Sequence, residues 1–320
     1  LRRAGVGLVS IANNHILDQG RAGLEETVEQ LDRLGMPYVG AGPAGREPGP
    51  RILTLNGIRV AFLAYARFLN QSGNDCPAIP RARPCVRASL LDADRAIADV
   101  GAAAAAADAV VVSLHWGEEY ADQPREQDVA LAHRLADAGA LIVLGHHPHV
   151  LQPLEVYRRA DGASTLIAYS LGNFVSNQSR NYVHGVTPAS VAATRHGVLL
   201  RAELVRRDYG RGITRVELGG VGWFPLWTEN DTAEPERRAA GRRPSIRVVS
   251  VDRALAATRE ELRGLPDPLP RELQARFVAL RQREELLSAQ RTAIAAVLGE
   301  DLERTAPPPA QAAVTPAASR

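Results

Sequence analysis

Lysine is absent from this sequence of 320 residues, so all 38 basic residues are arginines. Because acidic residues nearly balance them, the formal net charge is only +2, which gives no global attraction to nucleic acid. No apolar run reaches the roughly 18 residues that a membrane-spanning helix needs, so we expect no transmembrane segment. These absences favour a globular protein that contacts neither nucleic acid nor the membrane interior, and a hydrophobic content of 45 % is enough for a sizeable core.

Cysteine is scarce as well, since the chain contains only Cys76 and Cys85. The segment between them is rich in proline and predicts a loop. In an oxidising compartment a local disulfide would close this loop; otherwise both side chains are free or buried thiols. The spacing does not resemble a zinc knuckle, and no nearby histidine could complete one. The state of the two cysteines stays open at this point.

Strand-like and helix-like patterns alternate over the first two hundred residues, with Asn56-Gly57 as a strong hairpin signal. Strands joined through helices by short connections favour parallel pairing. We therefore predict an α/β sandwich with an antiparallel portion. The predicted strands are 6–11, 51–55, 58–65, 109–114, 140–144, 151–157, 165–170, 197–206 and 213–218, and the predicted helices are 23–34, 88–107 and 126–138.

The C-terminal part has a different character. Residues 228–243 are polar and charged and predict a linker, after which 246–251 return as a strand. Residues 273–298 form a long amphipathic stretch, which we expect to pack on its own domain. We predict a domain at 1–227, a linker and last strand at 228–252, a helical extension at 253–304 and a disordered tail at 305–320.

Three of the eight histidines lie within four residues, in His146-His147-Pro148-His149. They follow the apolar run 140–144, which has the character of a buried strand. Imidazoles at the end of a buried strand are costly to bury unless a partner satisfies them, and a divalent metal is such a partner. A histidine-rich surface loop is the alternative.

Further polar clusters follow other predicted strands: Asn13-Asn14-His15, the segment from His115 to Tyr120, and Gly172-Asn173-Phe174. The carboxyl ends of parallel strands meet at one edge of a sheet, where α/β proteins bind ligands. A mixed set of imidazoles and an amide oxygen suits Zn, Mn or Fe better than Ca or Mg. Each cluster alone could also be a turn or a satisfied core histidine, but together they predict a site for one or two divalent metal ions.

These motifs resemble a known family. Asn14-His15 and His147-Pro148-His149 look like motifs of the calcineurin-like metallophosphoesterases. The resemblance to the bacterial CapA family, which is associated with poly-γ-glutamate capsule synthesis, is closer and covers roughly residues 5–225. The matching motifs, in the family's order, are Ala12-Asn13-Asn14-His15, His115-Trp116-Gly117-x-Glu119-Tyr120, His147-Pro148-His149 and Leu171-Gly172-Asn173-Phe174. The resemblance implies a metallophosphoesterase-like β-sandwich of two or four layers, flanked by helices, with a C-terminal helical extension.

The resemblance also implies a ligand set. Asn14, His115 and His147 would bind one metal, and His149 would serve a neighbouring position. His146 falls outside the pattern and would lie behind the ligands or on the surface.

His15 would be a general acid beside the metal rather than a ligand. Glu119, Tyr120 and Asn173 would line the substrate side. The resemblance thus assigns proton transfer and substrate contact to residues other than the ligands.

One departure from the family pattern concerns the acidic ligands. These families open with a strand that carries a metal-binding aspartate, followed by a second acidic ligand, whereas no acidic residue here precedes Asp18. The chain begins at Leu1 without a methionine or a signal peptide, so we expect an upstream portion to be missing. On this hypothesis the chain alone binds metal weakly and turns over poorly.

The functional prediction is a metal-dependent hydrolase that cleaves a phosphoester or a glutamyl-amide bond in capsule metabolism, with His15 as general acid. Its partners would be an acidic polymer or a small phosphoester, together with capsule-synthesis proteins. The alternative is a non-catalytic component of the cell envelope that binds an acidic capsule polymer. The resemblance places the protein in the cell envelope or outside the cell, with the cytoplasm still open.

Overall fold

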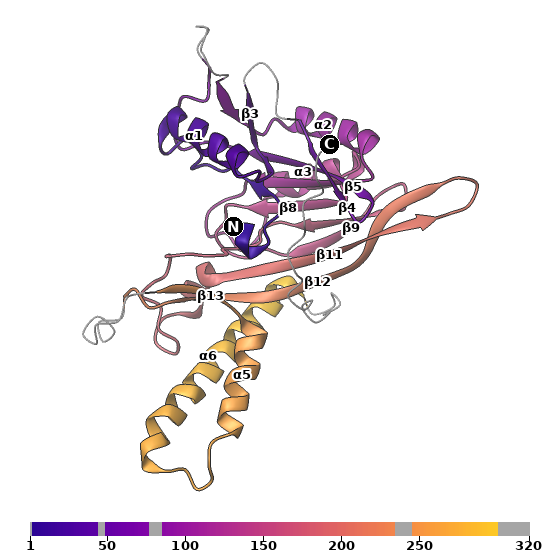
Figure 1. Ribbon diagram of the computed structural model, residues 1–320. Coiled ribbons are helices and arrows are strands. Elements are labelled where there is room, and N and C mark those ends of the chain that lie inside the picture. The colour runs from indigo at the N-terminus through magenta and orange to yellow at the C-terminus, as the bar shows by residue number, and fades with distance from the viewer. Residues whose placement is uncertain (1, 44–48, 77–84, 234–244, 300–320) are drawn as a thin grey trace.

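A mixed six-stranded sheet forms the centre of the protein (Figure 1). The structure is a computed structural model and describes residues 2–43, 49–76, 85–233 and 245–299. The strand order is β4-β5-β7-β8-β10-β9; the four inner strands run parallel, and both edge strands are antiparallel to their neighbours. The strands are β4 (Arg51–Leu55), β5 (Ile58–Ala66), β7 (Ala109–His115), β8 (Ile142–His146), β10 (Ser164–Ala168) and β9 (Leu154–Arg158).

Two helices cover one face of this sheet. In α2 (Ala93–Ala106) the buried side chains are small, and in α3 (Glu126–Asp137) Leu131 and Leu135 point into the core. They pack against the aliphatic side chains of β5, β7 and β8, which explains why these strands are continuous apolar runs rather than alternating ones.

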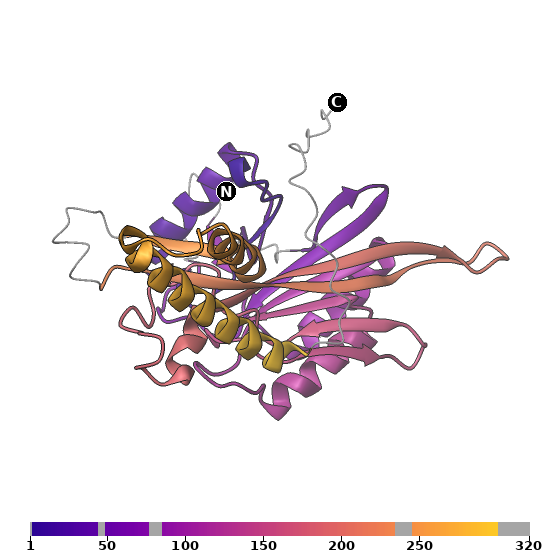
Figure 2. The same cartoon turned by 90° about the horizontal axis from the view of Figure 1, so that it is seen from below.

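A second, antiparallel sheet packs on the other face through aliphatic side chains of both sheets. It consists of β11 (His196–Asp208), β12 (Thr214–Asn230) and β13 (Ile246–Ser250). The hairpin of β11 and β12 extends beyond the body of the protein (Figure 2). The molecule therefore has a layer of helices, a layer of six strands and a layer of three strands.

A helical hairpin projects from the far side of the second sheet (Figure 1). Its helices are α5 (Val251–Arg263) and α6 (Gln274–Leu298). Leu287 and Ile294 of α6 are fully buried in a core cluster that also contains Trp227 of β12, so this end of the hairpin is fixed to the body by apolar packing. Among the described residues no helix is both long and apolar enough to cross a membrane.

The N-terminal part adds the parallel pair β1 (Val9–Ser10) and β2 (Tyr38–Val39), helix α1 (Gly20–Arg33) and the pair β3 (Ala41–Pro43) and β6 (Val86–Ala88). Short 3-10 helices are η1 (Arg2–Ala4), η2 (Ala189–Arg195) and η3 (Arg271–Leu273).

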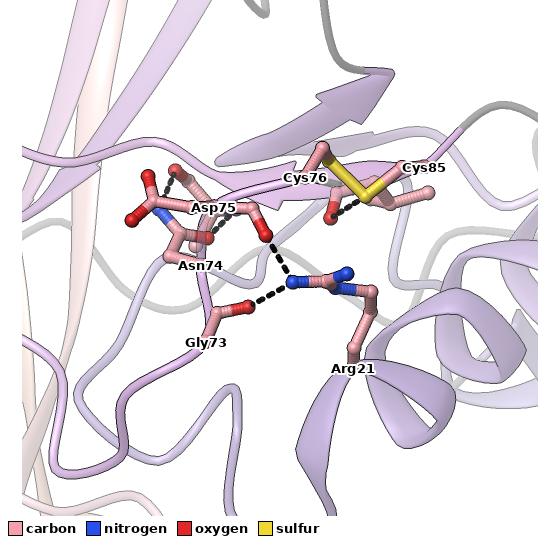
Figure 3. The surroundings of a disulfide bond; sticks show 8 residues. Arg21, Gly73, Asn74, Asp75, Cys76 and Cys85 are labelled. Carbon is pink, nitrogen blue, oxygen red and sulfur yellow. Dashed lines mark hydrogen bonds between the residues drawn. A yellow bond between two sulfur atoms is a disulfide. The ribbon is translucent and has the colours of Figure 1, made fainter. Parts of the chain in front are cut away.

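Cys76 and Cys85 form a disulfide, which decides the question that the sequence left open (Figure 3). Beside it, Arg21 of α1 donates hydrogen bonds to the carbonyl oxygens of Gly73 and Asp75.

Most predicted elements are confirmed, including the hairpin at Asn56-Gly57, but several boundaries were wrong. The strand predicted at 6–11 shrinks to β1, and the helix predicted from residue 88 begins at Ala93, because Asp92 accepts a hydrogen bond from the Arg95 backbone and caps it. The strand predicted at 213–218 continues to Asn230, because it pairs with both β11 and β13. Most of the predicted linker (234–243), the end of the helical extension (300–304) and the predicted tail (305–320) lie outside the described residues.

Candidate functional site

The predicted ligand residues meet where the parallel strands end. His115 is the last residue of β7, His147 follows β8 directly, and Asn14 lies in the loop after β1. The Oδ1 atom of Asn14 lies 2.9 Å from Nε2 of His115, and the rings of His115 and His147 have their centroids 4.9 Å apart. We call Asn14, His115 and His147 the histidine site.

The turn after β8 has an unusual backbone. His147 and His149 both adopt positive φ angles, 102° and 62°. Residues other than glycine rarely adopt this conformation, and where it occurs it commonly marks a functional site. This conformation was not predicted from the sequence. The turn presents the two imidazoles from a strained but fixed backbone.

Gly145 allows this turn to approach its neighbours. A Cβ atom at this position would lie 1.8 Å from the carbonyl oxygen of Tyr169 and 2.6 Å from Nε1 of Trp116. The Trp116 indole is fully buried and donates to that same carbonyl oxygen at 3.1 Å. The tight contact explains why a glycine stands before the histidines.

His147 carries an unsatisfied polar atom. Its side chain is buried, and Nδ1 has no hydrogen-bond partner among the described residues. The ring instead packs edge-on against Phe68, with the centroids 5.0 Å apart. A buried nitrogen without a partner is costly in free energy, and such atoms commonly accept a water or an ion.

Burial also keeps these imidazoles neutral. Burial and, after it, the charge of the neighbouring His147 ring lower the pKa of His115 to about 3. Burial lowers the pKa of His147 as well. Neutral imidazoles have a free lone pair at neutral pH, which is the form that binds metal.

The residues fit one metal position in part. Two ligand atoms at about 2.1 Å from one ion lie roughly 3 Å apart when they subtend a right angle, which agrees with the 2.9 Å between Asn14 Oδ1 and His115 Nε2. Within the part of the chain that the structure describes, no three histidine, cysteine or acidic side chains form a ready metal-binding group. The donor set therefore consists of an amide oxygen, the His115 imidazole and the unpartnered His147 nitrogen.

His15 lies at the exposed rim of the site. Its Nδ1 is 2.7 Å from Oδ2 of Asp18, and 56 % of its side chain is exposed. A charge on His15 is among the causes that lower the pKa of His115 and of His147. The structure thus separates His15 from the histidine site while keeping it within electrostatic reach.

His149 belongs to a second group of polar side chains. Its Nδ1 lies 3.0 Å from Oδ1 of Asn173, its Nε2 lies 3.9 Å from Oε1 of Glu119, and its ring stacks with that of Tyr120. The Asn173 amide nitrogen is directed at the carbonyl oxygens of His149 and Thr194, among other acceptors. The structure therefore brings His149 together with all three predicted substrate-side residues and uses Asn173 to hold the turn.

His146 is the half-buried last residue of β8, and its carbonyl oxygen accepts a hydrogen bond from the Trp116 backbone at 3.0 Å. Burial lowers the pKa of His146 to about 4. It lies behind the turn, one of the two positions that the sequence left open.

Asn70 lies beside Asn14 and was not among the predicted site residues. Its Oδ1 accepts from Nδ2 of Asn14 at 3.0 Å, and its own amide nitrogen lies 3.4 Å from Nδ1 of His15. Asn70 orients the Asn14 oxygen toward His115, because it occupies the other end of that amide. The available signal was its place in the loop after β5, another inner parallel strand.

Arg67 and Arg125 were also absent from the predicted site residues. The fully buried Asp128 accepts hydrogen bonds from Arg67 and Arg125. The Arg67 backbone also donates to the carbonyl oxygen of His115, and the charge of Arg125 is among those that lower the pKa of His147. The Asp128 carboxylate thus holds the two guanidinium groups together, and the Arg67 backbone joins this pair to the histidine site.

Comparison with known proteins agrees with the resemblance noted in the sequence. Residues 1–178 match the family described as "Bacterial capsule synthesis protein PGA_cap". The chain is 36 % identical over 179 residues to "Capsule biosynthesis protein CapA" of Bacillus anthracis, covering 56 % of this chain and 42 % of that protein. It is 37 % identical over 176 residues to "PGA biosynthesis protein CapA" of Bacillus subtilis, covering 53 % and 43 %. A "Probable polyglutamine synthesis accessory protein" of Mycobacterium tuberculosis is 37 % identical over 157 residues, covering 47 % and 41 %. Each match thus covers less than half of the relative's length.

Proposed function

This chain belongs to the PGA_cap family of bacterial capsule synthesis proteins, and on that premise we propose that its histidine site holds a divalent metal and hydrolyses a phosphoester or glutamyl-amide bond in poly-γ-glutamate capsule metabolism. The observation that carries the proposal is the buried, unpartnered Nδ1 of His147 beside the neutral His115 ring. Such an atom is unfavourable without a partner, and a metal ion is the partner that suits imidazole.

We further infer that the fold is a metallophosphoesterase-like sandwich. Two facing sheets, with helices α2 and α3 on the outer face of the larger one, are consistent with that architecture. The placement of the polar residues after inner parallel strands supports the same inference, because this edge is where such folds bind ligands.

Asn14, His115 and His147 would hold one metal ion, and His149 would serve a neighbouring position. The mixed nitrogen and oxygen donors favour Mn, Fe or Zn. Such an ion supplies Lewis-acid activation of water near neutral pH. Asn70 fixes the direction of the Asn14 oxygen, and the left-handed turn fixes the His147 ring.

His15 would act as the general acid. Its Nδ1 lies 2.7 Å from the Asp18 carboxylate, which leaves Nε2 as the atom that can protonate a leaving group. The half-exposed ring can reach a substrate bound at the rim. Asp18 would orient His15 without touching the substrate.

The substrate would be anionic. Arg67 and Arg125 beside the site can attract a phosphate or a carboxylate, and arginine suits both groups. Glu119 and Tyr120, next to His149, would contact the substrate chain.

A non-catalytic role in binding an acidic capsule polymer is the second candidate. It is favoured by the donor set, in which no three histidine, cysteine or acidic side chains of the described ranges meet. In either case we propose a position in the cell envelope or outside the cell, with capsule-synthesis proteins as partners. The Cys76–Cys85 disulfide supports that location, since disulfides persist in oxidising compartments.

The test of the metal site is the exchange of His147 for alanine. We expect His147→Ala to weaken Mn or Zn binding at least tenfold, because the loss of even an outer partner of a metal ligand costs about 10- to 100-fold. The matched control is His133→Ala, a half-buried histidine that pairs with Glu155 on the outer side of the sheet. Equal metal binding by both variants, measured by calorimetry, would refute the site.

His15→Ala separates the two candidate functions. A hydrolase should lose turnover of bis(p-nitrophenyl) phosphate or γ-glutamyl-p-nitroanilide by roughly 100-fold or more and keep its metal, because general acid catalysis contributes about 10²- to 10⁴-fold. A polymer-binding protein should show no turnover before the exchange and unchanged polymer affinity after it.

A further inference from the structure

A cavity of about 810 Å³ lies beside the second sheet, outside the matched part of the chain. Its walls come from the loop before η2, from the end of η2, from β12 and from α6. The residues that matter are Arg180, Tyr182, Arg195, Trp227, Arg283 and Glu285, and we call this space the arginine cavity.

Its lining is cationic. Three of these residues are arginines and one is a glutamate. Arg283 is 2.7 Å from Glu229, whereas Arg180 is exposed to solvent. A concave surface with an excess of arginine attracts and concentrates anions.

Arg195 is the fixed cation of this surface. It is only 5 % exposed, and its guanidinium lies over the rings of Tyr182 and Trp227, at 5.8 and 5.4 Å from their centroids. It also donates to the carbonyl oxygen of Asn230 at 3.2 Å. A guanidinium that is already held in place loses little conformational entropy when it binds an anion.

The walls are held by a polar contact inside the core. Gln290 of α6 is buried, with its Oε1 2.7 Å from Nε2 of His196 and its amide nitrogen donating to the Tyr182 hydroxyl at 3.4 Å. The helix is thereby joined to the loop and to β11. The cavity is a built feature of the fold.

A chain of hydrogen bonds connects the cavity with the histidine region. Asn173, which contacts His149, donates to the carbonyl oxygen of Thr194 at 2.9 Å, and Arg195 is the next residue. The Thr194 hydroxyl lies 2.7 Å from that of Ser179, the residue before Arg180. The cavity and the histidine region are therefore joined through Asn173 and Thr194.

We propose that the arginine cavity binds carboxylate groups of an acidic polymer and anchors the chain that the histidine site acts on. This identification of the polymer as γ-linked glutamate rests on the proposed function. Arginine forks accept carboxylates and phosphates alike, but the volume exceeds that of a single phosphate and falls in the range of about 300–1,000 Å³ typical of organic ligands. The half-buried Tyr182 ring gives the methylene groups of such a chain an apolar surface.

The test is calorimetric titration of the purified chain, in EDTA, with a γ-linked glutamate oligomer of about ten residues. We expect Arg180→Gln and Arg195→Lys each to weaken binding roughly tenfold, since each removes a charge-assisted or bidentate contact. The matched control is Arg211→Gln, in the distant turn between β11 and β12, which should change the affinity less than twofold. Arg180 is exposed, so its variant should fold normally even if Arg195→Lys does not.

Three results would overturn the proposal: equal losses in the control and the cavity variants, unchanged binding in Arg180→Gln, or binding of tripolyphosphate with no binding of the glutamate oligomer. Because EDTA removes metal, this readout is independent of turnover. Retained oligomer binding in His147→Ala, with lost metal binding, would support the cavity even if the hydrolase proposal failed.

Discussion

The histidine site and the arginine cavity both contain buried side chains that can carry a positive charge, but the two regions differ in whether that charge is kept. Burial disfavours a charged side chain, and a histidine responds by giving up its proton, so His115 has a pKa of about 3. Arginine cannot do this, and the buried Arg195 instead keeps its charge against two aromatic faces and a carbonyl oxygen. One region thus offers lone pairs and the other offers a permanent cation.

The two regions also differ in how they are positioned. The histidine site is set by backbone: strand ends, a left-handed turn and close glycine contacts. The arginine cavity is formed by side chains from segments that are distant in the sequence, including helix α6. All of these segments follow the part of the chain that matches the family. Substitutions at glycine should therefore harm the first region most, and loss of polar side chains should harm the second.

Gly145→Ala should have the largest effect. A methyl group 1.8 Å from the Tyr169 carbonyl oxygen forces the strand ends apart, and we expect the free energy of unfolding to fall by about 4 kcal/mol or more. Denaturant unfolding measures it, with Gly49→Ala as control, because a Cβ at Gly49 meets nothing within 4 Å. Equal stability of the two variants would show that Gly145 does not lie in close contact with the Tyr169 carbonyl oxygen.

Acidification should have the second-largest effect, a fall in the free energy of unfolding that comes from His115. The pKa of His115 is about 3 when folded and about 6.5 when unfolded, so between these pH values the unfolded chain binds the extra proton and stability falls as the pH falls. From pH 6.5 to 4.5 this amounts to about 2–3 kcal/mol. His115→Gln should lose correspondingly less over that interval, as measured by unfolding at each pH. Parallel curves for both proteins would contradict the assignment.

Gln290→Ala tests the walls of the arginine cavity. It leaves the buried His196 without its 2.7 Å partner, which should cost about 2 kcal/mol of unfolding free energy. Gln282→Ala, an exposed position on the same helix, should change stability by less than about 0.5 kcal/mol. A smaller loss in Gln290→Ala than in Gln282→Ala would mean that α6 does not support the cavity.

Asn173→Ala should have the smallest effect on stability, about 1 kcal/mol, because its partners lie in partly buried turns where water can replace it. Its informative result is local: the His149 ring loses its Nδ1 partner, and its NMR resonance should shift while that of His133 does not. An unchanged His149 resonance would contradict the role of Asn173 in holding the turn.

Local sequence pattern was enough for much of the fold. The turn propensity of Asn56-Gly57 predicted the hairpin of β4 and β5, and the apolar runs predicted the inner strands. Boundaries failed where a neighbour decided them, as in β12, whose length depends on pairing with β11 and β13. The polar clusters that follow the strands were predictable as one site, because the carboxyl ends of parallel strands meet at one edge of the sheet.

The family, the strand-end motifs and the residue types at the histidine site could all be identified before folding was considered, because they are encoded in short contiguous segments. Packing brings Asn70 to Asn14 across 56 positions, gives His147 a left-handed backbone and leaves its Nδ1 without a partner among the described residues. Only it brought Arg180, Arg195 and Arg283 to one cavity. The physical reason is that periodicity reflects neighbours along the chain, whereas burial, pKa and contact depend on segments that packing brings together.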